Sequence, residues 1–574
     1  MEKDKDIKGV FGLLFNNEDE IKLATLLYEK LEEGSIAIAE KDLKTEFDTD
    51  FLNKYTKDKI LPFVFENGNI YFHRYFKYET FIIDSIKRLI ECKYDVFLEK
   101  KDDIESIITD FVEKVFPVSV ENEVNWQKVA IINSVYNTFN IITGGPGTGK
   151  TWTVTYLLAL LFTIKNDAKV ALVAPTGKAA MRLKESIRNT LHGDIDNLRG
   201  VSNKLEEINA LTIHRLLGFG KSGLYFHYNS DNKLPYDLIV VDESSMIDVA
   251  LMAKLLNAVN DGTKVILLGD SNQLASVEAG SVFGDLCRAQ DKENYFEKIQ
   301  LGLINSFLFD NEKISDNNIV KNSNLITGKI ITLKKNFRAK EHPGIISIAQ
   351  SIIDGNRENI KPNEDVEVIS NIENVEKELI KYITDYEGFI KESDIKVAIR
   401  ALNKVKILCA LNEGRFGVDE MNRLVENYLK SKKLIEPKGV FYHNMPVMMT
   451  YNDYDKNLYN GDVGLIRTDK NGKLKVYFLS DNEDVKSFDP YNINGLVKNF
   501  AMTIHKSQGS EFEKVIILLP TNTETRILTR ELIYTAVTRA KNKVYMFVND
   551  DVMEYVLNNT ALRSSGITNR IKIM

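Results

Sequence analysis

Short apolar segments alternate with longer segments of helical periodicity from about residue 119 onward. Each apolar segment is rich in Val, Ile and Leu and is bounded by turn residues. Uninterrupted apolar runs of this kind are typical of strands that are buried on both faces of a parallel sheet. The pattern therefore predicts a first parallel sheet built from the segments Phe139–Thr143, Lys169–Ala174, Leu238–Asp242 and Lys264–Gly269.

The same pattern predicts a second set of strands at Lys396–Arg400, Lys514–Leu519 and Val544–Val548. Two α/β cores in tandem are the simplest account of the two sets. Residues 441–478 alternate between apolar and polar positions around two Asn-Gly pairs, which predicts a small β-barrel inserted in the second core. Residues 1–118 carry apolar positions at helical spacing, so we expect a mostly helical N-terminal domain.

The composition is that of a soluble globular protein, with 574 residues of which 44% are hydrophobic and 27% charged. Lys and Arg number 75 against 82 Asp and Glu, so contact with nucleic acid would depend on a local basic groove. The three cysteines form no Cys-x-x-Cys pair, which favours buried thiols over a zinc site or disulfides. We expect a cytoplasmic protein, because the sequence shows no signal peptide and no apolar stretch that could span a membrane.

Residues 144–151 match the phosphate-loop pattern G-x-x-x-x-G-K-[ST]. Glycines let backbone N–H groups turn toward phosphate oxygens, and the helix that follows adds the positive end of its dipole. Lys150 would reach the β- and γ-phosphates, and the Thr151 hydroxyl would bind Mg²⁺. The predicted nucleotide site comprises Gly144, Gly145, Pro146, Gly147, Thr148, Gly149, Lys150 and Thr151.

Two carboxylates follow the third predicted strand. Asp242 would lie beside the phosphate loop as a second ligand of Mg²⁺, and Glu243 would orient or deprotonate the attacking water. Gln273 follows the next strand, where an amide can sense a γ-phosphate or cap a turn, and the spacing favours neither role. Together with the phosphate loop, these residues predict a nucleoside triphosphatase.

Six further motifs accompany the phosphate loop and Asp242-Glu243, in the order Ala174–Ala180, Thr212–Gly218, Gly269–Gly280, Leu333–Arg338, Thr503–Glu511 and Tyr534–Lys541. In this order the eight motifs resemble those of the 5′-to-3′ branch of the superfamily 1 helicases. The stretches Thr-Ile-His-Arg-Leu-Leu-Gly and Ala-Ser-Val-Glu-Ala-Gly resemble the RecD family, the alpha subunit of exodeoxyribonuclease V. The resemblance covers about residues 119–550.

The resemblance implies an α/β fold with two tandem RecA-like P-loop domains. The implied units are a helical N-terminal domain over residues 1–118, a first core over 119–330 with a hairpin insert at about 219–235, and a second core over 331–574 with an SH3-like β-barrel insert at about 436–498. In the family a hairpin such as Tyr225–Leu234 separates strands, although an inert surface loop would have the same sequence pattern.

The resemblance also assigns roles to residues outside the phosphate loop. Gln127 would read the adenine of ATP, and Glu511 would hold the ribose. Arg338 and Arg539 would reach the γ-phosphate from the second core as arginine fingers. Contacts to DNA that ignore base identity would come from Thr176, Lys178, His214, Thr503 and His505. Without the motifs, either histidine would be interpreted as a structural residue.

The predicted function is that of an ATP- and Mg²⁺-dependent 5′-to-3′ DNA helicase that binds single-stranded and duplex-end DNA. The resemblance implies a motor subunit of an exodeoxyribonuclease V complex in recombination and repair, with RecB-like and RecC-like subunits docked on residues 1–118 and the nuclease on another subunit. Two alternatives are a nucleotide-gated binding subunit and a helicase of conjugative DNA transfer. The first would have no use for Lys150, Glu243, Arg338 and Arg539 together, and the second would carry a relaxase-type Tyr/His cluster, which is not evident.

Overall fold

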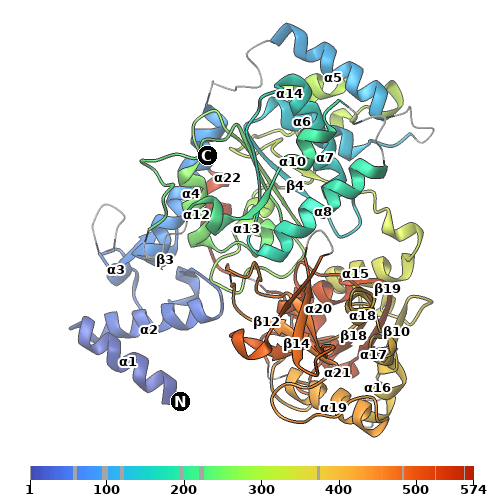
Figure 1. The fold of residues 1–574 in the computed structure, drawn as a ribbon. Coiled ribbons are helices and arrows are strands. Elements are labelled where there is room, and N and C mark those ends of the chain that lie inside the picture. The colour runs from blue at the N-terminus through green and yellow to red at the C-terminus, as the bar shows by residue number, and fades with distance from the viewer. Residues whose placement is uncertain are drawn as a thin grey trace.

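Two parallel β-sheets with helices packed against them dominate the computed structural model of the chain (Figure 1). The protein is therefore of the mixed α/β class, as its apolar segments predict. No helix in the described part of the chain is both long and apolar enough to cross a membrane. The structure describes every residue except 1, 45, 56–60, 93–100, 117–121, 194–197, 199, 219–224, 371–374, 454, 481–483, 524 and 562.

The first sheet is wholly parallel and has the strand order β6-β5-β7-β8-β4-β9. The four predicted strands are confirmed as β4, β5, β7 and β8, while the sequence pattern misses the short edge strands β6 and β9. Strand β9 extends past the expected boundary at residue 330, so the first core continues to residue 332. The strands are β4 (Phe139–Thr143), β5 (Val170–Ala174), β6 (Ala210–Thr212), β7 (Leu238–Val241), β8 (Lys264–Gly269) and β9 (Ile330–Thr332).

Helices cover both faces of the first sheet, and two of them come from the segment expected to form a separate N-terminal domain. Helix α5 (Lys101–Val115) packs with α6 (Trp126–Tyr136) and α7 (Lys150–Ile164) in one hydrophobic cluster. Helix α4 (His73–Glu91) packs with α12 (Val249–Ala258) in the cluster on the other face. The expected boundary at residue 118 is therefore wrong, because the apolar sides of α4 and α5 are buried against the first core. The other helices here are α8 (Gly177–Gly193), α10 (Ser202–Glu207), α11 (Ile213–Leu216), α13 (Val282–Arg288) and α14 (Lys298–Asn305).

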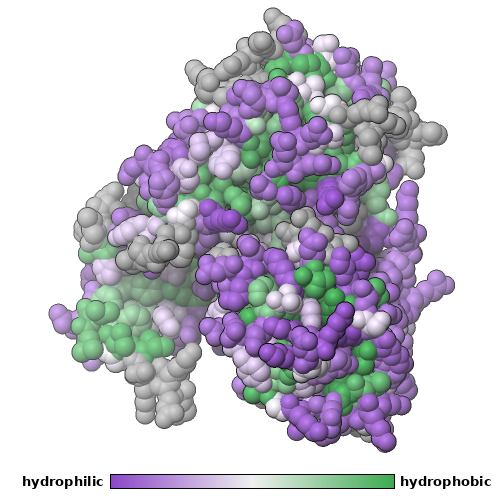
Figure 2. Space-filling model, viewed as in Figure 1, coloured by the Kyte–Doolittle hydropathy of each residue, from purple (hydrophilic) through white to green (hydrophobic). Residues whose placement is uncertain are grey.

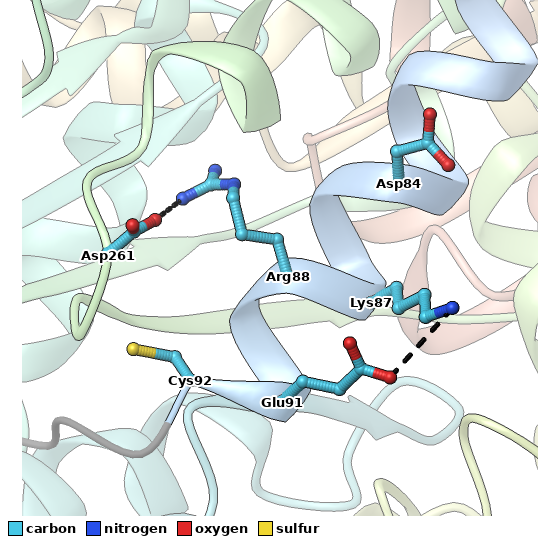
Figure 3. Close-up of a pocket in the computed structure, with 6 residues that line it drawn as sticks. All are labelled: Asp84, Lys87, Arg88, Glu91, Cys92 and Asp261. Carbon is cyan, nitrogen blue, oxygen red and sulfur yellow. Dashed lines mark hydrogen bonds and ion pairs between the residues drawn. The ribbon is translucent and has the colours of Figure 1, made fainter.

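An arginine of α4 fastens that helix to the first core. The Arg88 guanidinium pairs with Asp261 (Figure 3). It also donates to the backbone oxygens of Leu256 and Val259, at 3.3 and 3.0 Å. These carbonyls lie at the carboxyl end of α12, where a helix leaves acceptors unpaired and a cation is favoured. The shallow cavity in Figure 3, lined by residues of α4 and by Asp261, is the surface around this capping contact.

Residues 2–72 form a small unit that contains strands as well as helices, so the expectation of a helical N-terminal domain is incomplete. Its three strands form an antiparallel sheet in the order β1-β3-β2. The β2–β3 hairpin turns at Asn67-Gly68, both with positive φ, between two apolar runs. This Asn-Gly is a strong local hairpin signal. The elements are α1 (Glu2–Leu14), α2 (Glu18–Glu32), β1 (Ala37–Ala39), α3 (Thr49–Leu52), β2 (Phe63–Glu66) and β3 (Asn69–Phe72).

The second sheet is also parallel, with the order β10-β19-β18-β11-β17. Two of its predicted strands are confirmed, but Lys396–Arg400 lies inside helix α18 (Ile395–Leu402), and the strand is β11, further along the chain. Asp394 caps α18 by accepting the N–H groups of the second and third residues after it. The strands are β10 (Val366–Ile369), β11 (Val405–Cys409), β17 (Ala501–Thr503), β18 (Phe512–Leu518) and β19 (Ala540–Phe547), and the helices are α15 (Pro343–Asp354), α16 (Val375–Ile383), α17 (Tyr386–Lys391), α19 (Val418–Ser431), α20 (Arg530–Val537) and α21 (Asp550–Asn558).

The insert in the second core is an antiparallel sheet of five strands in the order β15-β14-β13-β12-β16. Its apolar side chains belong to the same hydrophobic cluster as one face of the second sheet. The expected barrel is not closed by backbone pairing between the edge strands β15 and β16 in the described residues. The strands are β12 (Met445–Met449), β13 (Val463–Thr468), β14 (Leu474–Leu479), β15 (Val485–Phe488) and β16 (Leu496–Lys498).

The C-terminal segment leaves the second core and returns to the first. Helix α22 (Ile567–Lys572) packs against α13 and α4, and its two buried isoleucines join the cluster of the first core (Figure 1). Just before α22, the Ser564 carbonyl accepts the N–H groups of Ile36 and Ala37 at 3.0 and 3.3 Å. The expected second core, residues 331–574, is therefore too long at its C-terminal end.

Candidate active site

The phosphate loop connects β4 to the first turn of α7. Gly147 and Gly149 adopt φ of 82° and 81°, a region that favours glycine. A Cβ on Gly147 would lie 2.7 Å from the Cβ of Arg338, and one on Gly149 would collide with the amide of Gln127. Lys150 folds over the loop and donates to the carbonyls of Gly144 and, at 3.2 Å, Gly145. A glycine-rich loop before a helix N-terminus fits a nucleotide phosphate chain.

The two predicted acidic residues follow β7 at the carboxyl end of the sheet. Glu243 has a φ of 49°, which is strained for a residue with a side chain, and its N–H donates to Asp242 Oδ1 at 2.8 Å. Burial, and then the neighbouring Glu243 carboxylate, raises the pKa of Asp242 to about 6, while the charges of Lys150 and Arg182 oppose this rise. A half-buried carboxylate beside a second acid and close to the phosphate loop is suited to hold a divalent cation.

Strand β8 ends in a buried polar group that contacts the second core. The Asp270 carboxylate accepts the Gln273 amide at 3.2 Å and the Tyr534 hydroxyl at 2.9 Å, both on Oδ2. The Gln273 side chain is therefore held by Asp270 and does not cap a backbone turn. Burial raises the pKa of Asp270, and the nearby Lys150 ammonium lowers it.

Residues from the second half of the chain lie directly against the phosphate loop. The Phe337 N–H donates to the Gly147 carbonyl at 2.9 Å, and Asn336 donates to the Pro146 carbonyl, also at 2.9 Å. These contacts bring Arg338 to the loop, although it lies nearly two hundred positions further along the chain. On the other side of the loop, Gln127 donates to the Thr148 carbonyl at 3.1 Å.

The Glu511 carboxylate pairs with an arginine of each core. It accepts Arg338 Nη2 at 2.6 Å and pairs with Arg182 of α8 at 3.0 Å. Burial would raise the pKa of Glu511, but the Arg182 and Arg338 guanidiniums outweigh it and lower this pKa to about 2. The proposed ribose contact of Glu511 stays a prediction, and the structure shows the carboxylate held by these arginines.

Arg539, close to Glu511, is almost fully buried. Its Nε donates to the Thr535 carbonyl at 3.1 Å, and Nη1 donates to the Ser510 carbonyl at 3.3 Å. Burial lowers its pKa, and the carboxylates of Glu243 and Glu511 raise it. Arg539 is therefore held by backbone acceptors and lies within the field of two carboxylates of the site.

Two of the residues predicted to contact DNA lie at the start of α8, after β5. The Thr176 hydroxyl accepts the Ala179 N–H at 3.2 Å and so caps the helix. Lys178 reaches the insert of the second core and donates to the Gly461 carbonyl at 3.3 Å. Burial, reinforced by the charge of Arg182, lowers the pKa of Lys178 to about 8. The first turn of α8 thus connects the first sheet to the insert.

Thr503 is the last residue of β17, and His505 lies just after it, in a segment that meets α8. A Cβ on Gly509 of this segment would lie 3.7 Å from the Cβ of Ala179. His214, by contrast, follows the edge strand β6, and its ring centroid lies 5.9 Å from that of Phe226. Burial lowers the pKa of both histidines. The structure therefore brings the first turn of α8 and the segment after β17 together, and it places His214 after β6, the strand that neighbours β5.

A cleft of about 1230 Å³ lies between α8 and β6 on one side and the insert and α18 on the other. Two residues of the sequence motifs, Lys178 and Thr212, are among the residues that line it. Seven Lys and Arg side chains line it against three acidic ones. Because the whole chain is acidic, this local excess of positive charge is the kind of groove that a polyanion requires. The basic residues are Lys178, Arg182, Lys184, Arg188, Arg215, Arg400 and Lys486.

The expected hairpin at Tyr225–Leu234 is not a pair of strands. In this segment, Tyr228 donates its N–H to the Leu217 carbonyl at 3.0 Å, and Asn229 donates to the Asn232 carbonyl at 2.9 Å. Residues 225–237 contain no strand, and residues 219–224 lie outside the described part of the chain. The polar residues after Tyr228 favour a local turn over a ladder.

Three residues that join the site received no role from the sequence: Arg182, Asp270 and Tyr534. Asp270 and Tyr534 lie inside motifs that the sequence displays, three positions before Gln273 and five before Arg539. Arg182 lies two residues after its motif ends. Motif membership is therefore the signal that could have found the first two, while only the fold shows the third beside Glu511.

Comparisons with known proteins show what the chain is similar to. Residues 127–279 match the AAA domain family, and residues 498–547 match the UvrD-like helicase C-terminal domain. The chain is 36% identical over 550 residues to the RecBCD enzyme subunit RecD of Haemophilus influenzae, covering 89% of this chain and 82% of that protein. It is 33% identical over 471 residues to RecD of Mycobacterium tuberculosis, covering 80% and 75%. The solved Pif1 helicase of Candida albicans is 17% identical with a TM-score of 0.41, covering 78% of this chain and 97% of that one.

The phosphate loop, the acidic pair after β7 and the arginines that approach from the second core define a P-loop helicase motor. The similarity to the RecD subunits extends over most of the chain and most of each relative. The chain belongs to the RecD family.

Proposed function

We propose that the chain hydrolyses ATP between two RecA-like cores and uses the energy to move 5′-to-3′ along single-stranded DNA, unwinding duplex ends. One observation carries this proposal. The segment before Arg338 hydrogen-bonds to the phosphate loop, Arg338 pairs with Glu511, and Arg539 lies in the field of the Glu243 and Glu511 carboxylates. Charged residues from both cores at one nucleotide site make the relative position of the cores depend on that nucleotide, which is the basis of movement.

The first core would bind the nucleotide. Lys150 and backbone N–H groups of the glycine-rich loop would hold the phosphates, and Thr151 with Asp242 would hold Mg²⁺. Only two protein ligands are needed, because Mg²⁺ usually keeps phosphate oxygens and waters. Lys150 and the metal would keep Asp242 ionised, despite its raised pKa. ATP supplies the phosphoanhydride bond whose hydrolysis drives movement.

Glu243 would act as the general base, because its backbone conformation and its N–H bond to Asp242 hold its carboxylate at a defined place in the cleft. Arg539 and Arg338 would stabilise charge that develops in the transition state. In the structure Arg338 is paired with Glu511. That pairing would hold the guanidinium beside the loop until a phosphate competes for it. Gln127, fixed to the loop at Thr148, would read the adenine edge.

The basic cleft beside α8 would bind single-stranded DNA. Its lining includes Lys178 and lies next to Thr176, and the loop with Thr503 and His505 adjoins the same helix turn. Contacts of this kind reach phosphate and sugar and so are independent of sequence. His214 would contact the same DNA from the side of β6. In this proposal the antiparallel insert is an SH3-like element that closes the cleft.

The N-terminal unit would dock the partner subunits. On α1 the apolar residues Val10, Leu13 and Leu14 are 53%, 88% and 69% exposed. Figure 2 shows a hydrophobic area over the N-terminal helices at the edge of the molecule. Exposed apolar patches on a helix mark protein–protein contacts. We therefore place RecB-like and RecC-like subunits of an exodeoxyribonuclease V complex on this unit, with DNA repair as the setting and the cytoplasm as the location.

Unwinding of tailed duplexes tests the proposal. The purified chain is given duplexes with either a 5′ or a 3′ single-stranded tail, and Lys150→Ala serves as the control. Unwinding of only the 5′-tailed duplex, lost in Lys150→Ala, is the expected result. DNA-stimulated ATPase without unwinding would show that the motor requires its partner subunits. Absence of DNA-stimulated ATPase would refute the helicase proposal in favour of a nucleotide-gated binding subunit.

A further inference from the structure

A chain of buried polar groups crosses the boundary between the two cores at the end of β8. The Tyr534 hydroxyl of α20 donates to Asp270 Oδ2 at 2.9 Å, and the Gln273 amide donates to the same oxygen at 3.2 Å. The Asn272 N–H donates to the other oxygen, Oδ1, at 3.0 Å. Tyr534, Asp270 and Gln273 are each less than a tenth exposed. The carboxylate is thus shared by a tyrosine of one core and a glutamine of the other.

We propose that Tyr534 is a positioning residue for ATP hydrolysis, which fixes Gln273 through Asp270 when the second core is seated on the first. This inference rests on the proposed function, since it assigns how one residue of that site is oriented. An ionised carboxylate can only accept hydrogen bonds, so Gln273 must turn its NH₂ group toward Asp270. That leaves the amide oxygen of Gln273 as the acceptor available to the rest of the cleft.

Two further contacts bind the same segment to the second core. The Leu274 N–H donates to the Thr535 hydroxyl at 2.9 Å, and its carbonyl accepts the Gln508 amide at 2.9 Å. We call these two bonds and the Tyr534–Asp270 bond the inter-core latch. The residue that follows Gln273 is therefore held by its N–H and by its C=O. A displacement of α20 would break the Tyr534–Asp270 bond and the bond to the Leu274 N–H, which lie on the two sides of Gln273.

The latch is coupled to the phosphate loop and to the arginine finger. A Cβ on Gly145 would lie 3.1 Å from the Tyr534 hydroxyl, so the hydroxyl faces the loop as well as Asp270. Tyr534 lies on α20, and Arg539 follows this helix and donates to the carbonyl of its residue Thr535. Seating α20 therefore brings Tyr534 and Arg539 into place together. Because the Tyr534 hydroxyl bonds to Asp270, the orientation of Gln273 would depend on the same movement of α20 that positions Arg539.

The variant Tyr534→Phe tests this assignment, because it keeps the ring and removes only the hydroxyl. We expect kcat for DNA-stimulated ATP hydrolysis to fall about 10- to 100-fold, the effect of losing a hydrogen bond to a charged group. KM for ATP should change less than about twofold, because the lost bond orients a catalytic group. The control is Tyr136→Phe, at a tyrosine of α6 whose hydroxyl is buried and has no hydrogen-bond partner in the described structure.

Two further measurements separate positioning from a general loss of structure. In nucleotide-free protein, hydrogen exchange of residues 270–276 should speed up in Tyr534→Phe and stay unchanged in Tyr136→Phe. If Tyr534 acts through Asp270, the double variant Tyr534→Phe/Asp270→Asn should be no slower than Asp270→Asn alone. Unchanged kcat, an effect confined to KM, or multiplicative losses in the double variant would each overturn the inference. Failure of the proposed function itself would appear instead in the unmodified protein, as absent DNA-stimulated ATPase.

Discussion

A fully buried ion pair supports the helix that carries Gln127. The Lys128 ammonium on α6 is hydrogen-bonded to the Glu312 carboxylate, and the two side chains are 0% and 1% exposed. The same ammonium lies 4.3 Å from the centre of the Phe309 ring. Lys128→Met keeps an unbranched side chain of similar length and removes the charge. Glu312 is then left buried without its cation.

Removing one partner of a buried pair costs about 3–5 kcal/mol, because the remaining charge stays in a medium of low dielectric constant. For a unit of about 150–250 residues this corresponds to a fall in Tm of roughly 6–20 °C. The double variant Lys128→Met/Glu312→Leu removes both charges and fills the space with apolar atoms. It should recover most of the lost stability, since desolvating the pair offsets much of its attraction.

Thermal unfolding followed by circular dichroism measures these differences. Hydrogen exchange of α6 is recorded in parallel, because a chain of several units need not unfold in one transition. Lys313→Met is the matched control in the same segment. Lys313 pairs with Asp310 at 2.6 Å, but the two side chains are 48% and 96% exposed. Loss of such an exposed pair should leave Tm almost unchanged, because solvent screens it.

The same substitution should weaken nucleotide binding. Gln127 precedes Lys128 and donates to the Thr148 carbonyl of the phosphate loop at 3.1 Å. A loosened α6 should raise KM for ATP about 3- to 10-fold, the equivalent of one neutral hydrogen bond. The reasoning is refuted if Lys128→Met lowers Tm no more than Lys313→Met, or if the double variant is no more stable than Lys128→Met.

Two further predictions follow from buried charges. Arg539→Ala should bind a fluorescent ATP analogue almost normally and lower single-turnover hydrolysis about 10³- to 10⁵-fold; an equal loss of affinity would contradict the finger role. Glu79 is buried and accepts the Gly566 N–H at 2.7 Å, and burial raises its pKa to about 7. This raised pKa stabilises the native state below the unfolded pKa near 4.5, and the contribution is lost as pH rises through about 7. Between pH 5.5 and pH 8 the free energy of unfolding of Glu79→Gln should therefore rise by about 2 kcal/mol relative to that of the unmodified protein. Thermal unfolding at the two pH values measures this, and a difference that does not change with pH would contradict it.

Local pattern determined much of the fold. Strands β4, β5, β7 and β8 are recognisable because each is a short apolar run with turn residues at its ends, and burial on both faces requires that composition. The phosphate loop is equally local, since its glycines and Lys150 act within one turn between a strand and a helix. The Asn67-Gly68 hairpin also carries a local signal.

Ambiguous segments show where local pattern fails. The run Lys396–Arg400 contains three consecutive apolar residues and is compatible with a short buried strand. The structure has a helix there, because Asp394 caps it and its apolar side chains meet the second sheet at helical spacing. Helices α4 and α5 were equally recognisable as helices, yet nothing in their periodicity indicates which unit buries their apolar faces.

The sequence by itself determined the parallel-sheet class, the phosphate loop and the acidic pair after β7, because these depend on residues close together in the chain. Tertiary structure alone decided which distant residues meet. Arg338 and Glu511 are 173 positions apart, and Asp270 and Tyr534 are 264 apart. Such contacts depend on how one sheet is seated against the other. That arrangement is set by the packing of whole surfaces, which the spacing of residues along either segment does not specify.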